Sequence, residues 1–337
     1  MPRVIVAALV AMVFSILVGP RFIAFLQRKE YGQQIREEGP QHHVAKQGTP
    51  TMGGLLIVIS ALAGYLALGH YTLYGVTVLV VMAACGLIGF MDDFLKIANA
   101  RSLGLSGRWK LLLLAVITVG VGAVTHHQGR HHSLFVPIVQ QRLPLWLFWY
   151  LLLFLIIAGA ANGVNLTDGV DGLAAGTSII ALFTFLAINV IAYIRSAPAT
   201  GPIPRDANKL DLAIAAAAII GAAIGFLWFN AFPAEVFMGD TGSMALGGAL
   251  GAFAIMSKTE FLLIFIGGIF VIEAVSVILQ VASFKYWGRR IFLMAPIHHH
   301  FEMKAWSDAK IMVRFWIVTA ILCASGFALW YRYYFRH

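Results

Sequence analysis

Ten long apolar runs, joined by short polar junctions, make up most of this 337-residue chain. A helix needs about 20 mostly apolar residues to cross a bilayer, and 60% of the residues are apolar whereas only 12% are charged. The mean hydropathy of +0.83 excludes a water-soluble globular protein. We therefore predict an all-α integral membrane protein that forms a single polytopic domain over residues 1–337. The ten predicted transmembrane segments are 4–25, 51–69, 72–90, 111–125, 144–161, 173–194, 211–229, 243–257, 261–284 and 311–331.

The distribution of charge predicts which ends of these segments face the cytoplasm. The junctions after the first, third, fifth, seventh and ninth segments hold 15 of the 24 Lys and Arg residues. The positive-inside rule therefore makes these junctions cytoplasmic and both termini periplasmic. They also hold 11 of the 15 acids, an excess that the rule does not explain. The net charge of +9 fits this topology, so we expect no nucleic-acid partner. The outer loops 126–143 and 195–210 are expected to be plain connectors.

Two adjacent carboxylates, Asp92 and Asp93, begin the junction after the third segment. They repel each other, and tandem carboxylates at a bilayer boundary are costly without a cationic partner. Lys96, one helical turn further on, or Mg²⁺ could supply that charge. The structural alternative is an ion pair at a helix end, but a functional site is the favoured interpretation.

The junction after the fifth segment repeats a polar residue every third position, at Asn162, Asn165, Asp168 and Asp171. Residues three apart share one face of a helical or 3₁₀ turn. The pattern therefore predicts a ridge of two amides and two carboxylates that binds a cation or a group rich in hydrogen-bond donors. A solvated loop is the alternative, but it would not explain why a polar residue recurs at every third position.

A further acid, Asp240, lies between Gly239 and Gly242, where the backbone can approach a ligand. Mg²⁺ takes oxygen ligands, of which one or two come from carboxylates and the rest from water and phosphate. One aspartate alone is a weak indication of a metal site. The position of Asp240 on the same side of the membrane as the other acids is a much stronger indication of one.

The remaining two cytoplasmic junctions carry groups suited to anions. Lys46 precedes a Thr49-Pro50 pair that is typical of a helix start, and a helix N-terminus favours an anion. A capped helix with a solvated lysine is an equally good interpretation of that segment. The histidines at 298–300 lack zinc-site spacing. Imidazoles that donate to phosphate fit better, with an unspecialised His-rich loop as the alternative.

These groups together favour one reaction class. Acids to hold Mg²⁺, with Lys and His to meet anionic oxygens, are the components of phosphoryl transfer. The chain lacks the Gly-x-x-x-x-Gly-Lys-Ser/Thr motif, so it is not a P-loop ATPase. A site at the membrane surface implies one water-soluble and one lipid-bound substrate.

Five sequence blocks stand out along the chain: Lys-x-Gly-Thr-Pro-Thr-Met-Gly-Gly (46–54), Asp-Asp-Phe-x-Lys (92–96), Asn-Leu-Thr-Asp-Gly-x-Asp-Gly-Leu-Ala (165–174), Phe-Met-Gly-Asp-Thr-Gly-Ser (237–243) and Ala-Pro-Ile-His-His-His-Phe-Glu (295–302). They resemble those of the phospho-N-acetylmuramoyl-pentapeptide transferases, of the polyprenyl-phosphate N-acetylhexosamine-1-phosphate transferase superfamily. The resemblance implies a ten-span enzyme of the bacterial inner membrane, often a homodimer, with its active site in the cytoplasmic loops. Such an enzyme transfers phospho-MurNAc-pentapeptide from UDP-MurNAc-pentapeptide to undecaprenyl phosphate, giving lipid I and UMP with Mg²⁺, in the first membrane step of peptidoglycan synthesis.

The resemblance also implies roles at matching positions. Asp240 is the expected magnesium ligand, Asp92 the expected base for the lipid phosphate, and Phe237 is expected to stack near the uracil. Small departures follow the His block at Ala305 and Ser307, where glycine and proline are common in the family. The expected catalytic residues are Asp92, Asp93, Asp240 and His298. The expected substrate-binding residues are Lys46, Lys110, Asn162, Asn165, Asp168, Asp171, Asn230, Phe237, Gln280, His299 and His300.

Three alternatives stay open on the sequence. The lipid phosphate attacks the β-phosphate directly, which we favour because a phosphate monoester is largely ionised near neutral pH, or an aspartate forms a covalent intermediate. A relative that uses a UDP-N-acetylhexosamine donor would share the same chemistry. A secondary transporter is the rival from another class, but transporters place polar residues near the midplane, and here the only acid deep in a segment is Glu273.

Overall fold

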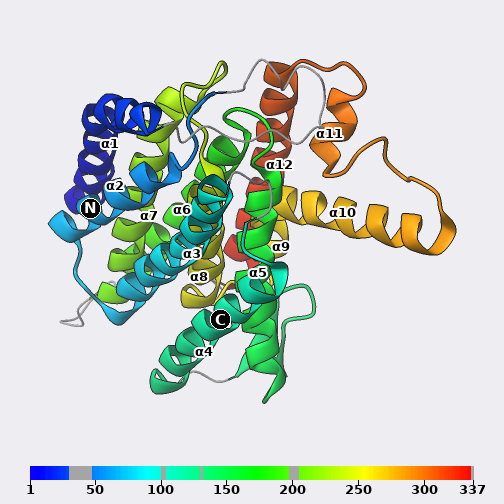
Figure 1. Cartoon of the computed structure of the whole chain (residues 1–337). Coiled ribbons are helices and arrows are strands. Elements are labelled where there is room, and N and C mark those ends of the chain that lie inside the picture. Colours follow the sequence, from blue (N-terminus) through cyan, green and yellow to red (C-terminus); the bar gives the residue numbers. More distant parts are fainter. Residues whose placement is uncertain (30–47, 100–103, 130–131, 197–204, 335–337) are drawn as a thin grey trace.

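The computed structural model describes residues 1–29, 48–99, 104–129, 132–196 and 205–334. Lys46 lies outside these ranges. Within them the chain is helical apart from one short hairpin (Figure 1). The helices are α1 (Pro2–Arg28), α2 (Gly54–Leu68), α3 (Leu73–Ala98), α4 (Gly107–His127), α5 (Phe148–Thr167), α6 (Leu173–Arg195), α7 (Ala207–Asn230), α8 (Gly239–Met256), α9 (Leu263–Ile266), α10 (Gly268–Trp287), α11 (Ile297–Glu302) and α12 (Asp308–Tyr334), and the strands are β1 (Ser133–Val136) and β2 (Gln141–Pro144).

Each predicted transmembrane segment corresponds to a helix, or to two helices in the case of the ninth, so the all-α membrane fold is confirmed. Among the described residues, eight helices are long and apolar enough to cross a membrane. The other two predicted segments correspond to α2, which has only 15 residues, and to α8, which opens with a polar turn. The ninth segment differs from its prediction because the helix breaks at Gly267 into the short α9 and the longer α10.

The ends of the helices gather into two sets, as the topology predicts. At one end, Arg3 near the N-terminus contacts His70 after α2, and the His70 amide donates to Asp211 of α7. Arg195 of α6 donates to Tyr331 of α12 at the same end. The start of α1 and the last described turn of α12 therefore lie with the even-numbered junctions, and the junctions that carry the motifs meet at the opposite end.

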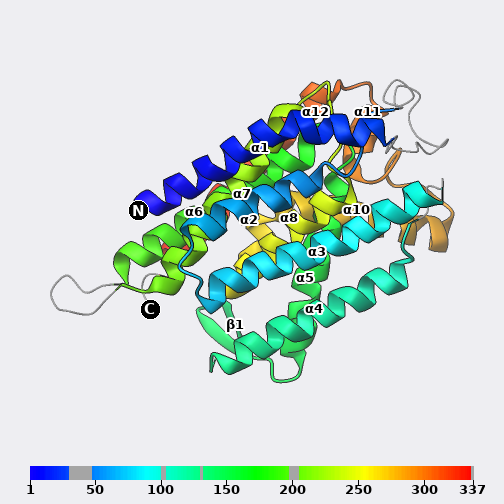
Figure 2. The same ribbon diagram turned by 60° about the vertical axis from the view of Figure 1, so that its left-hand side comes forward.

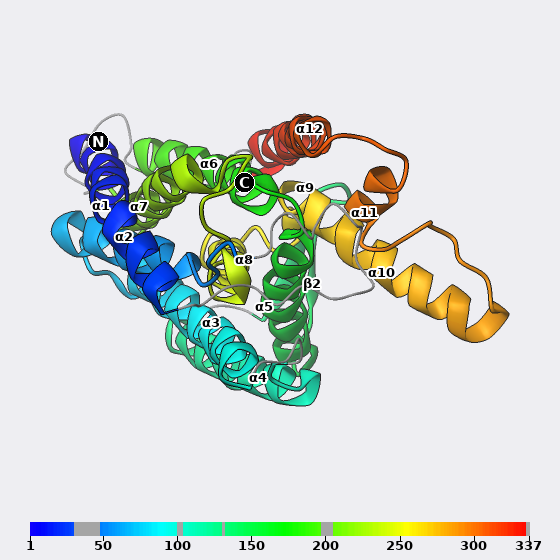
Figure 3. The same ribbon diagram turned by 45° about the horizontal axis from the view of Figure 1, so that its top comes forward.

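Small residues let the central helices pack closely. A methyl group added at Gly221 of α7 would overlap the backbone of Ala8 in α1, and one at Gly247 of α8 would overlap the backbone of Ala160 in α5. Close approach of this kind is the usual basis of helix association in membranes, where burial of apolar surface gives no advantage over lipid. Figure 3 shows α8 inside the bundle, where it packs against α2, α3, α5 and α6.

The outer connection between α4 and α5 is more structured than predicted. Strands β1 and β2 pair antiparallel, with Ser133 opposite Pro144 and Val136 opposite Gln141 (Figure 2). The prediction of a plain connector was therefore wrong for residues 133–143. Each strand has four residues, which is too short for an alternating pattern to stand out in the sequence.

Helix α10 leaves the bundle at an angle, so that its far end extends away from the other helices (Figures 1 and 3). Gln280 holds the following segment against the helix, because its side-chain amide donates to the carbonyl of Phe292 and accepts from the amides of Ile291 and Phe292. The chain then turns back through α11, which lies next to α10 and α12. This path returns the His block to the end of the bundle where the other motifs lie.

Candidate active site

The tandem acids lie inside a helix and not in a loop as predicted, because α3 continues to Ala98. Asp92 and Lys96 are one turn apart, which brings Lys96 Nζ to 2.6 Å from Asp92 Oδ2. Lys110 Nζ of α4 lies 3.1 Å from the other oxygen of Asp92, and the Leu105 amide donates to that oxygen at 2.6 Å. Asp92 is buried, and these groups balance its charge.

Asp93 points to the first turn of α8. Its Oδ1 accepts from the amide of Asp240 at 3.1 Å, and its Oδ2 accepts from the amide and the hydroxyl of Thr241 at 3.0 and 2.8 Å. The first amides of a helix have no partner within the helix, and a negative charge there also interacts well with the helix dipole. Asp93 therefore holds the start of α8 against the end of α3.

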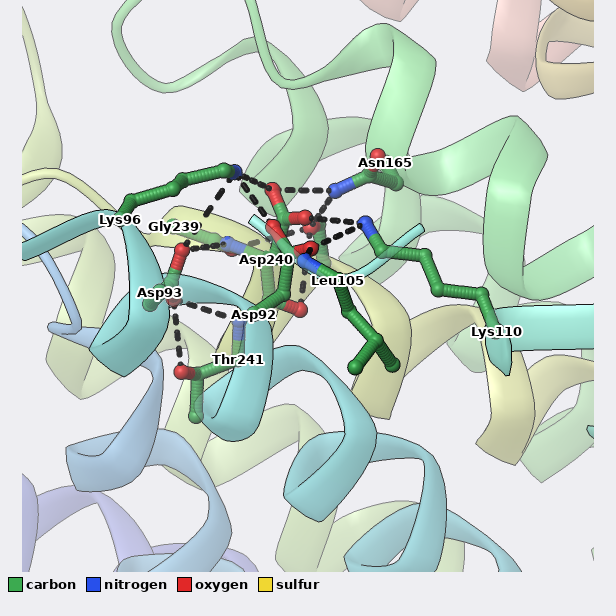
Figure 4. Close-up of polar contacts among 10 residues, drawn as sticks. Asp92, Asp93, Lys96, Leu105, Lys110, Asn165, Gly239, Asp240 and Thr241 are labelled. Carbon is green, nitrogen blue, oxygen red and sulfur yellow. Dashed lines mark hydrogen bonds and ion pairs between the residues drawn. The ribbon is translucent and has the colours of Figure 1, made fainter. Parts of the chain in front are cut away.

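Asp240 lies at the centre of the cluster (Figure 4). Lys110 Nζ donates to its Oδ2 at 2.8 Å, and Lys96 Nζ lies 3.3 Å from its Oδ1. Asn165 of α5 donates to the same Oδ1 at 2.9 Å and to Ser243 at 2.9 Å. Four helices therefore meet at this carboxylate: α3, α4, α5 and α8.

The donor set suits a divalent cation. One oxygen from each of Asp92, Asp93 and Asp240 lies within 4.8 Å of the others. Mg²⁺ prefers carboxylate oxygens and keeps free positions for water and phosphate. Because Asp93 already binds the start of α8, Asp92 and Asp240 are the acids better placed to bind a metal ion. The coarse prediction of an acidic metal site is thus supported by the geometry.

The predicted ridge of Asn162, Asn165, Asp168 and Asp171 is only partly formed, because α5 ends at Thr167. Asn162 donates back to the carbonyl of its own helix at residue 158, whereas Asn165 reaches Asp240. Asp168 follows the helix and faces the acid cluster. Removal from bulk water, followed by repulsion from Asp240 and Asp93, raises the pKa of Asp168 to about 8.

Asn230 and Asp171 join the two junctions on either side of α6 and α7. The Asn230 side chain accepts from the Gly172 amide at 3.1 Å and donates to the Val236 carbonyl at 2.9 Å. Asp171 accepts from the Ala234 amide at 3.2 Å. Both side chains thus position the backbone beside the cluster, and their predicted contact with substrate stays a prediction.

The three histidines point in different directions. His298 is buried, and its Nδ1 lies 3.1 Å from Glu273 of α10. His299 pairs through its own Nδ1 with Glu302, one turn along α11. The imidazoles of His298 and His299 lie next to each other, with ring centroids 4.1 Å apart. The two histidines therefore have different carboxylate partners.

His300 has a structural contact, since its Nδ1 accepts from the Leu293 amide at 3.1 Å. Partial burial and the positive charge of Lys304 lower the pKa of His300. The neutral ring suits the acceptor role of Nδ1. Its predicted contact with substrate is not tested by this geometry.

Phe237 and Gln280 both take part in hydrogen bonds that position the backbone. The Phe237 amide donates to the Pro50 carbonyl, and the Phe237 carbonyl accepts from Gly53, so the segment before α2 runs alongside the segment before α8. The ring of Phe237 is half-buried. The Gln280 amide is already bound to residues 291 and 292. Contact of either side chain with a nucleoside stays a prediction.

The counter-charge that the sequence suggests at Lys96 is present, because Lys96 lies against Asp92 and also against Asp240. Gly89 and the Leu105 amide are not among the predicted site residues. Gly89 packs so closely on the backbone of Asp240 that a methyl group would overlap it. The position of this glycine one helical turn before the tandem acids is a sequence signal that could have indicated close packing beside the site. The Leu105 amide left no signal in the sequence, because any residue type carries one.

Fold and site together define a multi-pass membrane enzyme with a carboxylate–lysine centre at one end of its helices. Residues 75–258 match the profile of glycosyl transferase family 4, and residues 46–58 match the phospho-N-acetylmuramoyl-pentapeptide-transferase signature 1. The chain is similar to the phospho-N-acetylmuramoyl-pentapeptide-transferase of Frankia alni, with 44% identity over 355 residues that cover 100% of this chain and 99% of the relative. Identity to the enzyme of that name from Frankia casuarinae is 45% over the same shares.

The chain therefore belongs to the phospho-N-acetylmuramoyl-pentapeptide-transferase family, and the predicted resemblance is confirmed. It is a transferase and a multi-pass membrane protein. The secondary-transporter alternative is set aside, because the relatives match over the full length of the chain.

Proposed function

We propose that this protein transfers phospho-MurNAc-pentapeptide from UDP-MurNAc-pentapeptide to undecaprenyl phosphate, with lipid I and UMP as products. The observation that carries the proposal is the cluster of Asp92, Asp240, Lys96 and Lys110 at the helix ends. It joins acids that suit Mg²⁺ to two ammonium groups that suit phosphate oxygens. The basic junctions at this end place it in the cytoplasm by the positive-inside rule, where a UDP-linked donor is available.

Charge and position are what the residues contribute to such a transfer. The transition state of phosphoryl transfer carries negative charge on its oxygens, and fixed cations stabilise it. Lys96 and Lys110 leave their carboxylate partners in part and donate to the diphosphate. Asp240 and Asp92 would hold Mg²⁺, which would supply positive charge next to the diphosphate of the donor. Asp92 accepts any proton that the lipid phosphate still carries.

Direct attack is the version that the geometry favours. An oxygen of the lipid phosphate bonds to the β-phosphorus, and the bond from that phosphorus to the bridging oxygen breaks as UMP leaves. A covalent intermediate on Asp92 would require its carboxylate to bond to phosphorus and to give up its ion pairs with Lys96 and Lys110 altogether. Asp93 is a poor nucleophile because its oxygens cap α8.

An exchange experiment separates direct attack from a covalent intermediate. Delipidated protein is incubated with Mg²⁺, UDP-MurNAc-pentapeptide and labelled UMP, without lipid phosphate. A covalent phospho-sugar enzyme would return label into the donor, whereas direct attack predicts no exchange until undecaprenyl phosphate is added. Exchange without lipid would overturn this part of the proposal.

The donor is tested by measuring UMP release and lipid product with two nucleotides. We expect turnover with UDP-MurNAc-pentapeptide and none with UDP-N-acetylglucosamine. Turnover with the second donor alone would keep the chemistry and assign another substrate. A homodimer also stays a prediction, which the mass of the detergent-solubilised protein measures directly.

A further inference from the structure

Glu273 and His298 form a buried pair between two separate helices. Glu273 lies in the first part of α10 and His298 in α11, and neither side chain is exposed to solvent. Oε1 of Glu273 lies 3.1 Å from Nδ1 of His298. Burying a carboxylate costs free energy unless a hydrogen-bond donor meets it. His298 is the group that meets the carboxylate of Glu273 here.

The second nitrogen of His298 faces the site. Nε2 is buried and has no hydrogen-bond partner within the described part of the chain. It points to Gly169, where an added methyl group would overlap it. Gly169 follows Asp168, whose carboxylate interacts with Asp240 and Asp93. The free nitrogen therefore faces the loop that borders the acid cluster.

The pair determines which nitrogen is free. A carboxylate that is ionised can only accept a hydrogen bond, so with Glu273 in that form the proton of the contact lies on Nδ1 of His298. A hydrogen bond to one ring nitrogen sets the tautomer and the orientation of the ring. Nε2 is then the nitrogen that meets a ligand, and the lack of a side chain at Gly169 leaves it room.

We propose that Glu273 is a positioning residue for the transfer reaction, which orients His298 so that Nε2 faces the substrate across Gly169. The inference rests on the proposed function. It concerns a residue that touches no substrate and acts through the histidine.

The test compares variants at Glu273 in the lipid I assay. Glu273→Gln keeps the size of the side chain, but its amide can donate to Nδ1 and so reverse the tautomer. Loss of the group that orients a metal-bound histidine typically costs about 10- to 100-fold in activity, and we expect a loss of the same order in Glu273→Gln. Glu273→Asp keeps the carboxylate and should recover part of the activity. Equal, near-normal activity of the Gln and Asp variants would overturn the proposal.

A double-variant cycle separates positioning from packing. If Glu273 acts through His298, Glu273→Gln should cost nothing further in a His298→Ala background. Losses that multiply would contradict the proposal. Gly169→Ala should likewise reduce activity in the wild type and have little effect in His298→Ala, where the space is vacated. Ser276→Ala is the matched control, because Ser276 is a buried polar residue of α10 that donates to the Glu273 carbonyl at 2.7 Å.

The cycle also distinguishes this inference from the proposed function. Wild-type protein that forms lipid I while the Glu273 variants are unaffected would overturn only the role of Glu273. Wild-type protein that forms no lipid I would overturn the function itself. Thermal unfolding in detergent verifies that each variant is folded.

Discussion

Asp93 accepts two hydrogen bonds from Thr241, one from its backbone amide at 3.0 Å and one from its hydroxyl at 2.8 Å. The neighbouring Asp92 makes no such contact and instead faces Lys96 and Lys110. Two adjacent acids of one helix thus have different structural partners and different roles. Asp93 fixes the position of α8, and through it the position of Asp240, whereas Asp92 and Asp240 present oxygens to the site.

The first prediction follows from this division. Asp93→Ala removes the cap of α8, and loss of a capping carboxylate lowers the free energy of unfolding by about 0.5–2 kcal/mol. Asp92→Ala removes activity but also relieves repulsion between acids, so its stability should stay near that of the wild type. Thermal unfolding in detergent measures the difference. Equal unfolding midpoints for the two variants would contradict the capping role.

Gly89 should be as sensitive as the acids themselves. Its added methyl group would overlap the backbone of Asp240, so α8 must move in Gly89→Ala. A misplacement of about 1 Å in a catalytic group can reduce activity about 100-fold, and we expect a loss of that order in UMP release. Gly86→Ala, one turn earlier, is the control, since its methyl group would come no closer than 3.2 Å to Ala245 Cβ, 3.3 Å to Val58 Cγ2 and 3.4 Å to the Thr241 carbonyl oxygen. Comparable losses in both variants would indicate general damage to α3.

Binding of Mg²⁺ should depend on pH through Asp168. Its pKa is raised to about 8 in the metal-free protein by removal from water and by the neighbouring acids. A bound cation favours the ionised carboxylate and lowers that pKa, so binding releases a proton. Affinity for Mg²⁺ should therefore rise by up to about tenfold per pH unit below pH 8 and level off above it.

Calorimetric titration of Mg²⁺ at pH 6, 7 and 8 measures this dependence. Asp168→Asn cannot release the proton, so its affinity should change less with pH. An unchanged slope in that variant would assign the proton to another group.

Ala305 offers a stabilising substitution. Its φ of 58° is in the left-handed region, which disfavours residues with a Cβ by about 1–2 kcal/mol. Ala305→Gly should therefore raise the unfolding midpoint without loss of activity. Ala320→Gly in the exposed middle of α12 is the control and should lower it, because glycine costs about 1 kcal/mol in a helix interior. A lower midpoint for Ala305→Gly would contradict the strain.

Much of the fold could be predicted because the length of each apolar run indicates whether it can form a helix that crosses the membrane. The ten runs became helices, and the motif-bearing junctions meet at one end. The break at Gly267 and the hairpin at 133–144 could not be predicted. Each involves only a few residues, which is too few for a periodic pattern of apolar residues to indicate it. The family resemblance, carried by five separate blocks, was confirmed over the full chain.

The site was predicted as a set of residues and less well as an arrangement. Asp92, Asp240, Lys110 and Asn165 do meet, as their shared side of the membrane implied. The separate role of Asp93 depends on how α8 docks on α3, which no local pattern encodes. The partners of Gln280 likewise follow from the path of the chain after α10.

The role of Asp240 as a magnesium ligand is tested most directly by UMP release at increasing Mg²⁺ in the wild type and in Asp240→Asn, with UDP-MurNAc-pentapeptide and undecaprenyl phosphate as substrates. We expect a saturable dependence on Mg²⁺ in the wild type, and no turnover of the variant at any concentration. Full activity of Asp240→Asn would remove Asp240 from the metal site and contradict the proposed magnesium-dependent transfer.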